Sequence, residues 1–416
     1  MEHGHLVHSI SALAGGNFLS SVLGAAGGLL VARFITPEVA GSFRSYTIPL
    51  MYLTFMHLGT FDGLHRQIPF YMGKDLPGEV NKAASASGAW NVLVAAIVSV
   101  AFLTLAAISF IKRDTQAGCG WLTQAAICWG TFYVGYLAAT YRTVSHFVAL
   151  AKINLFQSVT VFLLVFTLPF LAFYGLCLRA AVPSLLVLYL YHHFRPLKIP
   201  LKLDFTALKG VVSVGLPLCF WGALDTSLWM ALENSYLLSL GGVKELGLFS
   251  VVFVMREGLS MLTRAVHQVL APRIIEKFAR EGSLRRVTWE STKLSMLLVA
   301  VMLILVPLLS HGLDYFVPLV IPKYLDGVYA MKLALWVVVV DAASLPLNAL
   351  YATGKAWLYG RGVLAGLVVF AAVTPLLAAH VGALPAVVIG SLAGRIIRVV
   401  ACYIDLFIMI GSEVSD

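Results

Sequence analysis

Charged residues are scarce in this chain. Asp, Glu, Lys and Arg make up 12% of its 416 residues, whereas soluble domains contain about 25%. Apolar residues make up 60%, and the mean hydropathy is +0.88. This composition predicts a polytopic membrane protein. The net charge of +9 is scattered between apolar runs and does not form the clustered basic surface that binds phosphate backbones, so we expect no nucleic-acid partner.

Motifs of cross-linking and catalysis are also missing. The five cysteines form no C-x-x-C pair, and we interpret them as packing residues that imply neither a disulfide framework nor a metal site. The chain lacks the G-x-x-x-x-G-K-[ST] phosphate loop, which excludes ATP hydrolysis by that route. The longest predicted outer loop, around 311–330, is short for a folded catalytic region. We therefore expect a protein that moves a substrate without transforming it, with no enzyme activity and no cofactor.

Long apolar runs are abundant. A spanning helix needs about 20 mostly apolar residues, and the hydropathy pattern predicts an all-α protein with about twelve such helices. The predicted spans begin near residues 11, 43, 84, 119, 153, 176, 211, 246, 294, 330, 362 and 384. With the N-terminus inside, 17 of the 29 Lys and Arg residues fall in inner loops and 7 in or beside outer loops. Because cytoplasmic loops are enriched in Lys and Arg, both termini are predicted to be cytoplasmic.

A basic, proline-containing segment at 192–210 separates the first six predicted spans from the last six. We interpret it as a cytoplasmic linker between an N-terminal lobe, 1–191, and a C-terminal lobe, 211–416. Two short matches recur 206 residues apart. They are Gly41-Ser42-Phe43 with Gly247-Leu248-Phe249, and Leu168-Pro169 with Thr374-Pro375. Repeats of six helices each have the same orientation and are related by an axis along the membrane normal, as in many transporters.

Two neighbouring predicted spans carry charges near the middle of the bilayer. Residues three and four apart share a helix face, so each span presents a polar stripe. The stripes are Trp221, Asp225, Trp229 and Glu233 on one span, and Arg256, Ser260, Arg264 and His267 on the next. Asp225 is expected at the depth of Arg256 and Glu257. An ionisable residue in a span usually faces a partner or a wet cavity.

Two interpretations of these charges remain open. In the first, Asp225 and Arg256 form an ion pair that only locks the helical hairpin. In the second, both line a central cavity, where Arg256 contacts an anionic substrate and an acid couples movement to protons or cations. Asp341 and Arg395 are expected at similar depth and form a second candidate pair, and Arg398 shares a helix face with Asp405. The candidates are Arg256, Arg264 and His267 for substrate binding, and Asp225, Glu257 and Asp341 for ion coupling.

The segment GLHRQIPFYMGKD, 63–75, resembles the end of the second helix in Wzx-type polysaccharide flippases. These belong to the multidrug/oligosaccharidyl-lipid/polysaccharide (MOP) exporter superfamily. Further segments, 32–46, 245–274 and 322–335, look similar to the corresponding parts of that family. The residues that carry the first resemblance are Gly63, Leu64, Arg66, Ile68, Pro69, Tyr71, Gly73 and Lys74.

The resemblance implies a two-lobed bundle of twelve helices whose cavity faces each side of the membrane in turn. Its substrate would be an undecaprenyl-diphosphate-linked oligosaccharide, carried from the inner to the outer leaflet of the bacterial cytoplasmic membrane. Membrane lipids, a polysaccharide polymerase and chain-length proteins would be its partners. Arg256 would contact the phosphate, and Arg66 would contact the substrate at the cytoplasmic entrance.

This sequence departs from the family in one respect. The cavity of such flippases is often markedly cationic, whereas here Asp225 and Glu257 are expected beside Arg256. Either these acids neutralise the arginine until substrate arrives, or they couple transport to a proton or Na⁺. The second alternative leaves open a drug or small-solute antiporter of the same superfamily.

Overall fold

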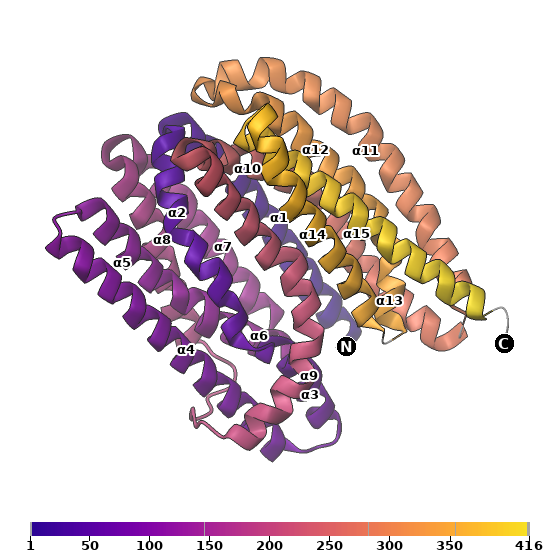
Figure 1. Ribbon diagram of the computed structural model, residues 1–416. Helices are drawn as coiled ribbons and strands as arrows, with labels where there is room; N and C mark the ends of the chain where they lie inside the picture. Colours follow the sequence, from indigo (N-terminus) through magenta and orange to yellow (C-terminus); the bar gives the residue numbers. More distant parts are fainter. Residues whose placement is uncertain (1, 145, 282, 354, 414–416) are drawn as a thin grey trace. The chain divides into compact units, whose positions relative to one another are not determined.

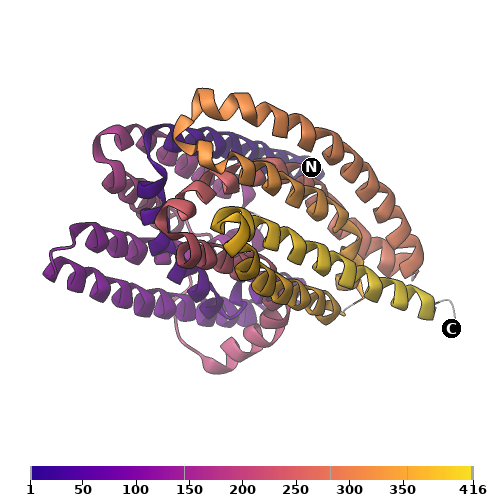
Figure 2. The same ribbon diagram turned by 45° about the horizontal axis from the view of Figure 1, so that its top comes forward.

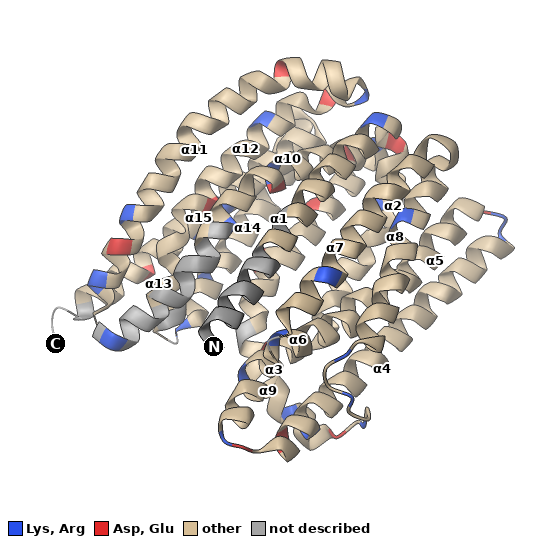
Figure 3. Cartoon of the chain, turned by 180° about the vertical axis from the view of Figure 1, so that it is seen from behind, with Lys and Arg blue, Asp and Glu red and all other residues tan. Residues whose placement is uncertain are grey.

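The structure, a computed structural model, describes residues 2–144, 146–281, 283–353 and 355–413 (Figure 1). Over these ranges the chain folds into helices joined by short turns, and no strand occurs among them. The predicted all-α fold class is therefore confirmed. Figure 3 shows how few Lys, Arg, Asp and Glu residues the helices carry along their length, as expected for helices that contact lipid.

The chain divides into two compact units. Unit 1 contains Met1–Ile35 and Tyr46–Ala223, and unit 2 contains Thr36–Ser45 and Leu224–Asp416. The predicted lobe boundary at 192–210 remains a prediction. The helices up to Ala223 are α1 (Glu2–Phe34), α2 (Pro37–Leu53), η1 (Thr54–His57), α3 (Thr60–Gly73), α4 (Pro77–Ile111), α5 (Thr115–Trp129), η2 (Gly130–Val134), α6 (Gly135–Thr143), α7 (Phe147–Leu163), η3 (Leu164–Thr167), α8 (Leu168–His193) and α9 (Phe205–Ala223).

Unit 2 holds the remaining helices, and its α14 and α15 pack side by side along most of their length (Figures 1 and 2). Small residues allow this close approach, because Gly366 lies against Gly394 and Gly362 against Cys402. The helices are η4 (Leu224–Leu228), α10 (Trp229–Glu281), α11 (Leu284–Val320), η5 (Pro322–Gly327), α12 (Val328–Ala343), η6 (Leu345–Leu347), α13 (Asn348–Ala352), α14 (Ala356–Val381) and α15 (Ala383–Glu413).

Six helical stretches within the described residues are long and apolar enough to cross a membrane. Two of them, 147–193 and 219–264, each contain a break. Ala172 has φ 44° and Gly242 has φ 75°, values outside the helical range. The sequence predicted new spans just after these breaks, near 176 and 246. The fold is that of a multi-pass membrane protein.

In unit 2 the start of α2 crosses the second part of α10 through a reciprocal glycine contact. A Cβ on Gly41 would overlap the carbonyl oxygen of Val243, and a Cβ on Gly247 would overlap that of Pro37. Pro37 and Val243 are 206 residues apart, and so are Gly41 and Gly247. Positions that are equivalent in the predicted repeat thus contact each other within unit 2. The repeat itself stays a prediction.

Unit 1 has a break in the middle of its second predicted span. The 3₁₀ helix η1 ends at His57, and both Leu58 and Gly59 adopt left-handed conformations before α3 begins. Gly59 N–H donates to His57 Nδ1 at 3.0 Å, which satisfies a backbone donor that the break leaves free. Gly59 also lies directly on the α9 backbone at Gly215. Glycine is required here for both its positive φ and its small size.

Candidate functional site

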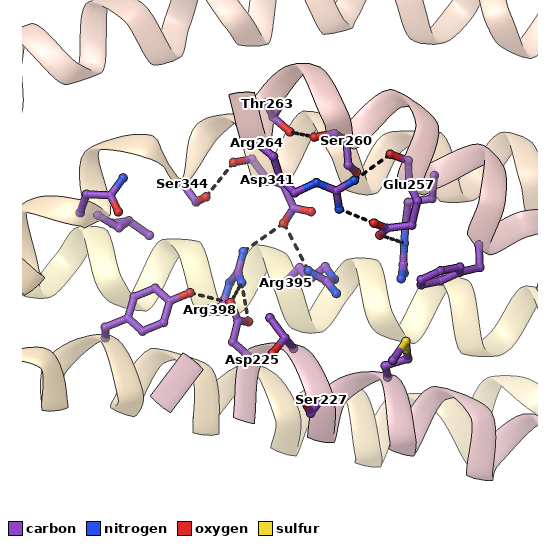
Figure 4. A pocket seen from close by; sticks show the side chains of 17 residues that line it. Asp225, Ser227, Glu257, Ser260, Thr263, Arg264, Asp341, Ser344, Arg395 and Arg398 are labelled. Carbon is purple, nitrogen blue, oxygen red and sulfur yellow. Dashed lines mark hydrogen bonds and ion pairs between the residues drawn. The ribbon is translucent and has the colours of Figure 1, made fainter. Parts of the chain in front are cut away.

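A cavity of about 550 Å³ lies within unit 2, between η4, α10, α12, α13, α14 and α15 (Figure 4). Most of its lining residues are polar or charged, and charged side chains enter it from four of these elements. The lining residues are Asp225, Thr226, Ser227, Met230, Phe253, Arg256, Glu257, Ser260, Thr263, Arg264, Asp341, Ser344, Leu347, Asn348, Tyr359, Arg395 and Arg398. Four arginines and three acids thus surround one space inside a membrane-spanning unit.

Asp225 is positioned by a local change in helix geometry. It lies in η4, a five-residue π-helical turn between α9 and α10. Such turns interrupt an α-helix for a few residues and often occur at functional sites. Asp225 accepts hydrogen bonds from Arg398 Nη1 at 2.5 Å and from the Tyr359 hydroxyl at 2.6 Å. The carboxylate therefore joins η4 to both α14 and α15.

Asp341, near the end of α12, is shared by two arginines of α15. Its Oδ1 accepts from Arg395 Nη1 at 3.3 Å and from Arg398 Nη2 at 3.1 Å, as Figure 4 shows. Arg395 and Arg398 are three residues apart and so lie on one face of α15. The Nε atoms of both arginines are buried and have no acceptor among the described residues. The two guanidinium groups therefore retain unused donor capacity beside the cavity.

Arg256 has a different environment. It donates to Glu233 Oε1 at 3.2 Å, and its Nε lies 3.9 Å from Glu257. Its guanidinium also lies over the ring of Phe253. Glu233 is only 1% exposed and accepts a second hydrogen bond, at 2.6 Å, from Ser391. A buried carboxylate needs such partners because removing its charge from water is costly.

The structure brings together most of the site residues predicted from the sequence. Asp225, Arg256, Glu257, Arg264 and Asp341 all line the cavity. Arg264 pairs with Glu257 on its own helix. The side chain of His267 is outside the part of the chain whose side chains the structure describes. Arg66 is exposed on α3 in unit 1 and does not belong to this cavity.

The expected pairings are only partly observed. Asp341 pairs with Arg395 as predicted. Asp225 and Arg256, the pair proposed as a structural lock, both line the cavity but bind other partners. Arg398, which was expected to share a helix face with Asp405, binds Asp225 and Asp341, and Asp405 pairs with Arg361. The prediction compared residues at the same depth in two neighbouring helices. It missed the arginines of α15, which come from a distant part of the sequence and pair with Asp225 and Asp341.

Arg395, Arg398 and Tyr359 also line the cavity, and Glu233 binds Arg256. None of these four residues was among the candidates for substrate binding or ion coupling, although Arg395 was expected to pair with Asp341 and Glu233 was placed in a polar stripe. Arg395 and Arg398 carried a signal that was available. Two arginines three residues apart in an otherwise apolar helix must share a face, and such residues usually face a partner or cavity. Tyr359 carried no comparable signal, because a tyrosine near the end of a span is common at membrane interfaces.

No protein-family model matches this chain, and no curated protein matches it in sequence. Solved structures do match its fold. An inward-facing multidrug resistance transporter of the MATE family in the MOP superfamily has a TM-score of 0.69 and 14% identity over 94% of this chain and 95% of that chain. The lipid II flippase MurJ, in an inward closed conformation, has a TM-score of 0.69 and 13% identity over 94% and 87%.

A third match is a MOP-superfamily transporter from Pyrococcus furiosus, described as having a binding pocket of reverse polarity. Its TM-score is 0.62, with 14% identity over 98% of this chain and 95% of that chain. This chain has the MOP-transporter fold. At such low identity the likeness shows the fold alone, so the function must be argued from the cavity itself.

The cavity of this MOP-type fold can bind charge of either sign. Each of its four arginines contacts at least one carboxylate: Arg256 and Arg264 contact Glu257, and Arg395 and Arg398 contact Asp341. An anion would have to compete with these acids for the guanidinium groups. A cation would have to compete with the guanidinium groups for the acids. An anionic substrate would therefore need to displace the carboxylates, and a cationic substrate would need to displace the guanidinium groups.

Proposed function

We propose that this chain is a MOP-type flippase for an undecaprenyl-diphosphate-linked oligosaccharide. The observation that carries the proposal is the set of four arginines lining a polar cavity within an apolar helical unit. A diphosphate and a sugar cannot cross hydrocarbon without partners that replace their water. Guanidinium groups suit this task because they form charge-assisted, often bidentate, hydrogen bonds with phosphate.

The substrate would move from the inner to the outer leaflet of a bacterial cytoplasmic membrane by alternating access, in support of cell-surface polysaccharide synthesis. Both chain termini would be cytoplasmic, and a polymerase and chain-length proteins would act on the exported unit. Arg256, Arg264 and His267 would contribute to substrate binding, with Arg66 at the cytoplasmic entrance. Asp225, Glu257 and Asp341 would couple the cycle to a proton or Na⁺.

A second candidate function is a cation- or proton-coupled antiporter for drugs or small solutes. The observation in its favour is the near balance of charge in the cavity, where three acids accompany the four arginines. A cationic solute could replace an arginine beside Asp225 or Asp341. The MATE transporters with the same fold include a multidrug resistance protein.

Reconstitution of the full chain separates the two functions. Liposomes would contain a defined lipid-linked oligosaccharide in both leaflets, and a membrane-impermeant glycosidase would digest whatever reaches the outside. Protein-free vesicles should lose only the outer-leaflet share, whereas vesicles with the protein should lose nearly all of it. The Lys244→Gln variant is a matched control, because Lys244 forms only an exposed ion pair with Asp326 and should leave the movement unchanged.

The antiporter is tested in the same vesicles with a fluorescent cationic drug and an imposed proton or Na⁺ gradient. Drug accumulation that depends on the gradient, without any loss of inner-leaflet oligosaccharide, would overturn the flippase proposal.

A further inference from the structure

We infer that Arg395 and Arg398 form the phosphate-binding subsite of the cavity, and that Asp341 and Asp225 occupy it when no substrate is bound. This inference rests on the proposed function, since it names the residues that hold the diphosphate. It differs from the expectation drawn from the sequence, in which Arg256 was the main phosphate contact.

The first support is the geometry of the two arginines. They project from one face of α15 and converge on the same oxygen, Asp341 Oδ1, at 3.3 and 3.1 Å. Two guanidinium groups that converge on one carboxylate oxygen can hold a phosphate oxygen in the same way, because arginine forms charge-assisted hydrogen bonds with both kinds of anion. Asp341 thus marks the position of an anion between Arg395 and Arg398, as Figure 4 shows.

The second support is the unused donor capacity of both arginines. A guanidinium has five N–H donors, and the Nε of each arginine is buried without an acceptor among the described residues. Two carboxylates therefore do not satisfy the pair completely. A diphosphate offers more acceptor oxygens and more negative charge than one carboxylate, so it can compete with Asp341 and Asp225 for the two guanidinium groups.

Arg256 is less suited to the same role. Its guanidinium is held by Glu233, which is buried and also bonded to Ser391. If a phosphate removed Arg256, Glu233 would keep its charge in a buried position without the cation that donates a hydrogen bond to it, which is costly. Asp341 differs, because its side chain is 28% exposed and it lines the cavity directly. The acids near α15 can therefore be displaced more easily than Glu233.

This arrangement predicts whether neutralising Asp341 strengthens or weakens the binding of an anion. Asp341 competes with the substrate phosphate for Arg395 and Arg398, so removing its charge should strengthen anion binding. A residue that only supported the fold would have the opposite effect, because its loss would disorder the site. A cation site would also respond in the opposite sense, since Asp341 would then be a ligand.

Binding of farnesyl diphosphate to the purified full chain in lipid nanodiscs tests the inference. Asp341→Asn should tighten binding by about tenfold, the effect of one charge-assisted hydrogen bond. Asp405→Asn is the matched control, because it neutralises a buried acid of α15 that pairs with Arg361 and does not line the cavity. Its affinity should stay within about twofold of the wild type.

The arginine itself is tested with a charge-balanced variant. Arg398→Gln alone would leave Asp225 without its cation, so it is combined with Asp225→Asn. The double variant should unfold near the wild-type temperature and bind farnesyl diphosphate at least about tenfold more weakly. Farnesol should bind both proteins equally. Arg398→Lys should restore only part of the affinity, because lysine keeps the charge but loses the planar fork.

Weaker binding by Asp341→Asn, or unchanged binding by the folded Arg398→Gln/Asp225→Asn variant, would overturn the inference. Either result could accompany normal movement of lipid-linked oligosaccharide in vesicles, in which case the proposed function stands and the phosphate binds elsewhere. Conversely, the variants could bind farnesyl diphosphate with the expected affinities while the protein moves no lipid-linked oligosaccharide in vesicles. That result would support the anion subsite and overturn the proposed flippase function.

Discussion

Unit 1 buries neutral polar side chains and an imidazole, whereas unit 2 buries carboxylates and guanidinium groups. Among the described residues of unit 1, the buried polar set is His57, Thr60, Ser87, Asn91, Ser99, Thr123, Gln124 and Thr140. In unit 2 the corresponding set includes Glu233, Arg256, Arg398 and Asp405. The buried polar groups of unit 1 can therefore be stabilised by hydrogen bonds alone, whereas those of unit 2 include charges that are stabilised by ion pairs.

The difference indicates where function resides. A hydroxyl or amide in a helix can be satisfied by its own helix, as Thr140 is by the carbonyl of Leu137, and it costs little once bonded. A buried charge needs an opposite charge and further hydrogen bonds, and apolar replacements often stabilise a protein. The four buried charges of unit 2 therefore give little reason to infer greater stability. They are better explained by the binding of a charged substrate or ion.

The largest effect is expected at the buried ion pair of Arg256 and Glu233 in unit 2. Arg256→Met leaves Glu233 without the cation that donates a hydrogen bond to it and should lower the free energy of unfolding by about 3–5 kcal/mol. Adding Glu233→Gln removes the unpaired charge and should restore most of this loss. Thermal unfolding of the two variants in detergent, followed by tryptophan fluorescence, measures the coupling.

Lys244→Gln, at an exposed ion pair, is the control and should change stability by less than about 1 kcal/mol. If Arg256→Met were as stable as this control, Glu233 would not depend on Arg256. Burying charges in unit 2 would then cost no more than burying neutral polar groups in unit 1.

A smaller effect is expected at the crossing of α2 and α10. A Cβ at Gly41 or Gly247 meets a backbone carbonyl, which cannot move without its helix. Gly41→Ala and Gly247→Ala should each cost about 1–3 kcal/mol, the usual range for overpacking. Because the positions are 206 residues apart and make reciprocal contacts, the two losses should be similar.

Gly258→Ala provides a control, since a Cβ at that helical position meets no neighbour, and alanine favours a helix. It should be neutral or slightly stabilising. A loss at Gly41 without any loss at Gly247 would show that the two contacts are not equivalent and would argue against the repeat.

The sequence predicted the fold more completely than the site. Apolar runs of about 20 residues are local signals, so the helices and the breaks near Ala172 and Gly242 could be anticipated. The repeat of Gly41 at Gly247 was also visible. The partners of buried charges could not be predicted in this way, because they depend on which helices contact each other. Asp225 finds Arg398, 173 residues away, and the stripe pattern of one hairpin could not reveal that contact.

The prediction for Arg256 and Asp225 shows the same limit. Both residues were expected at one depth, which stays a prediction, and the structure places both in one cavity wall. The π-helical turn at η4 and the arginines of α15 decide their actual partners. Neither feature follows from hydropathy or from a 3.6-residue period alone.

The smallest effect concerns the interior of unit 1. Gln124 is fully buried on α5, and neither its amide oxygen nor its nitrogen has a partner among the described residues. An unsatisfied buried amide costs about 1–3 kcal/mol. Gln124→Met keeps a similar volume and removes that cost, so it should raise the free energy of unfolding by about 1 kcal/mol. Thermal unfolding in detergent measures it.

Asn91 is the comparison, because its amide nitrogen donates to Thr60 Oγ1 and to the Ser87 carbonyl, while only its Oδ1 is without a partner among the described residues. Asn91→Leu should therefore destabilise unit 1 by about 1–3 kcal/mol, the cost of leaving such groups unpaired. If Gln124→Met were destabilising to the same extent, Gln124 would have a hydrogen-bonding partner in the native protein. The buried amide of Gln124 would then stabilise unit 1 through a hydrogen bond, as the amide of Asn91 does.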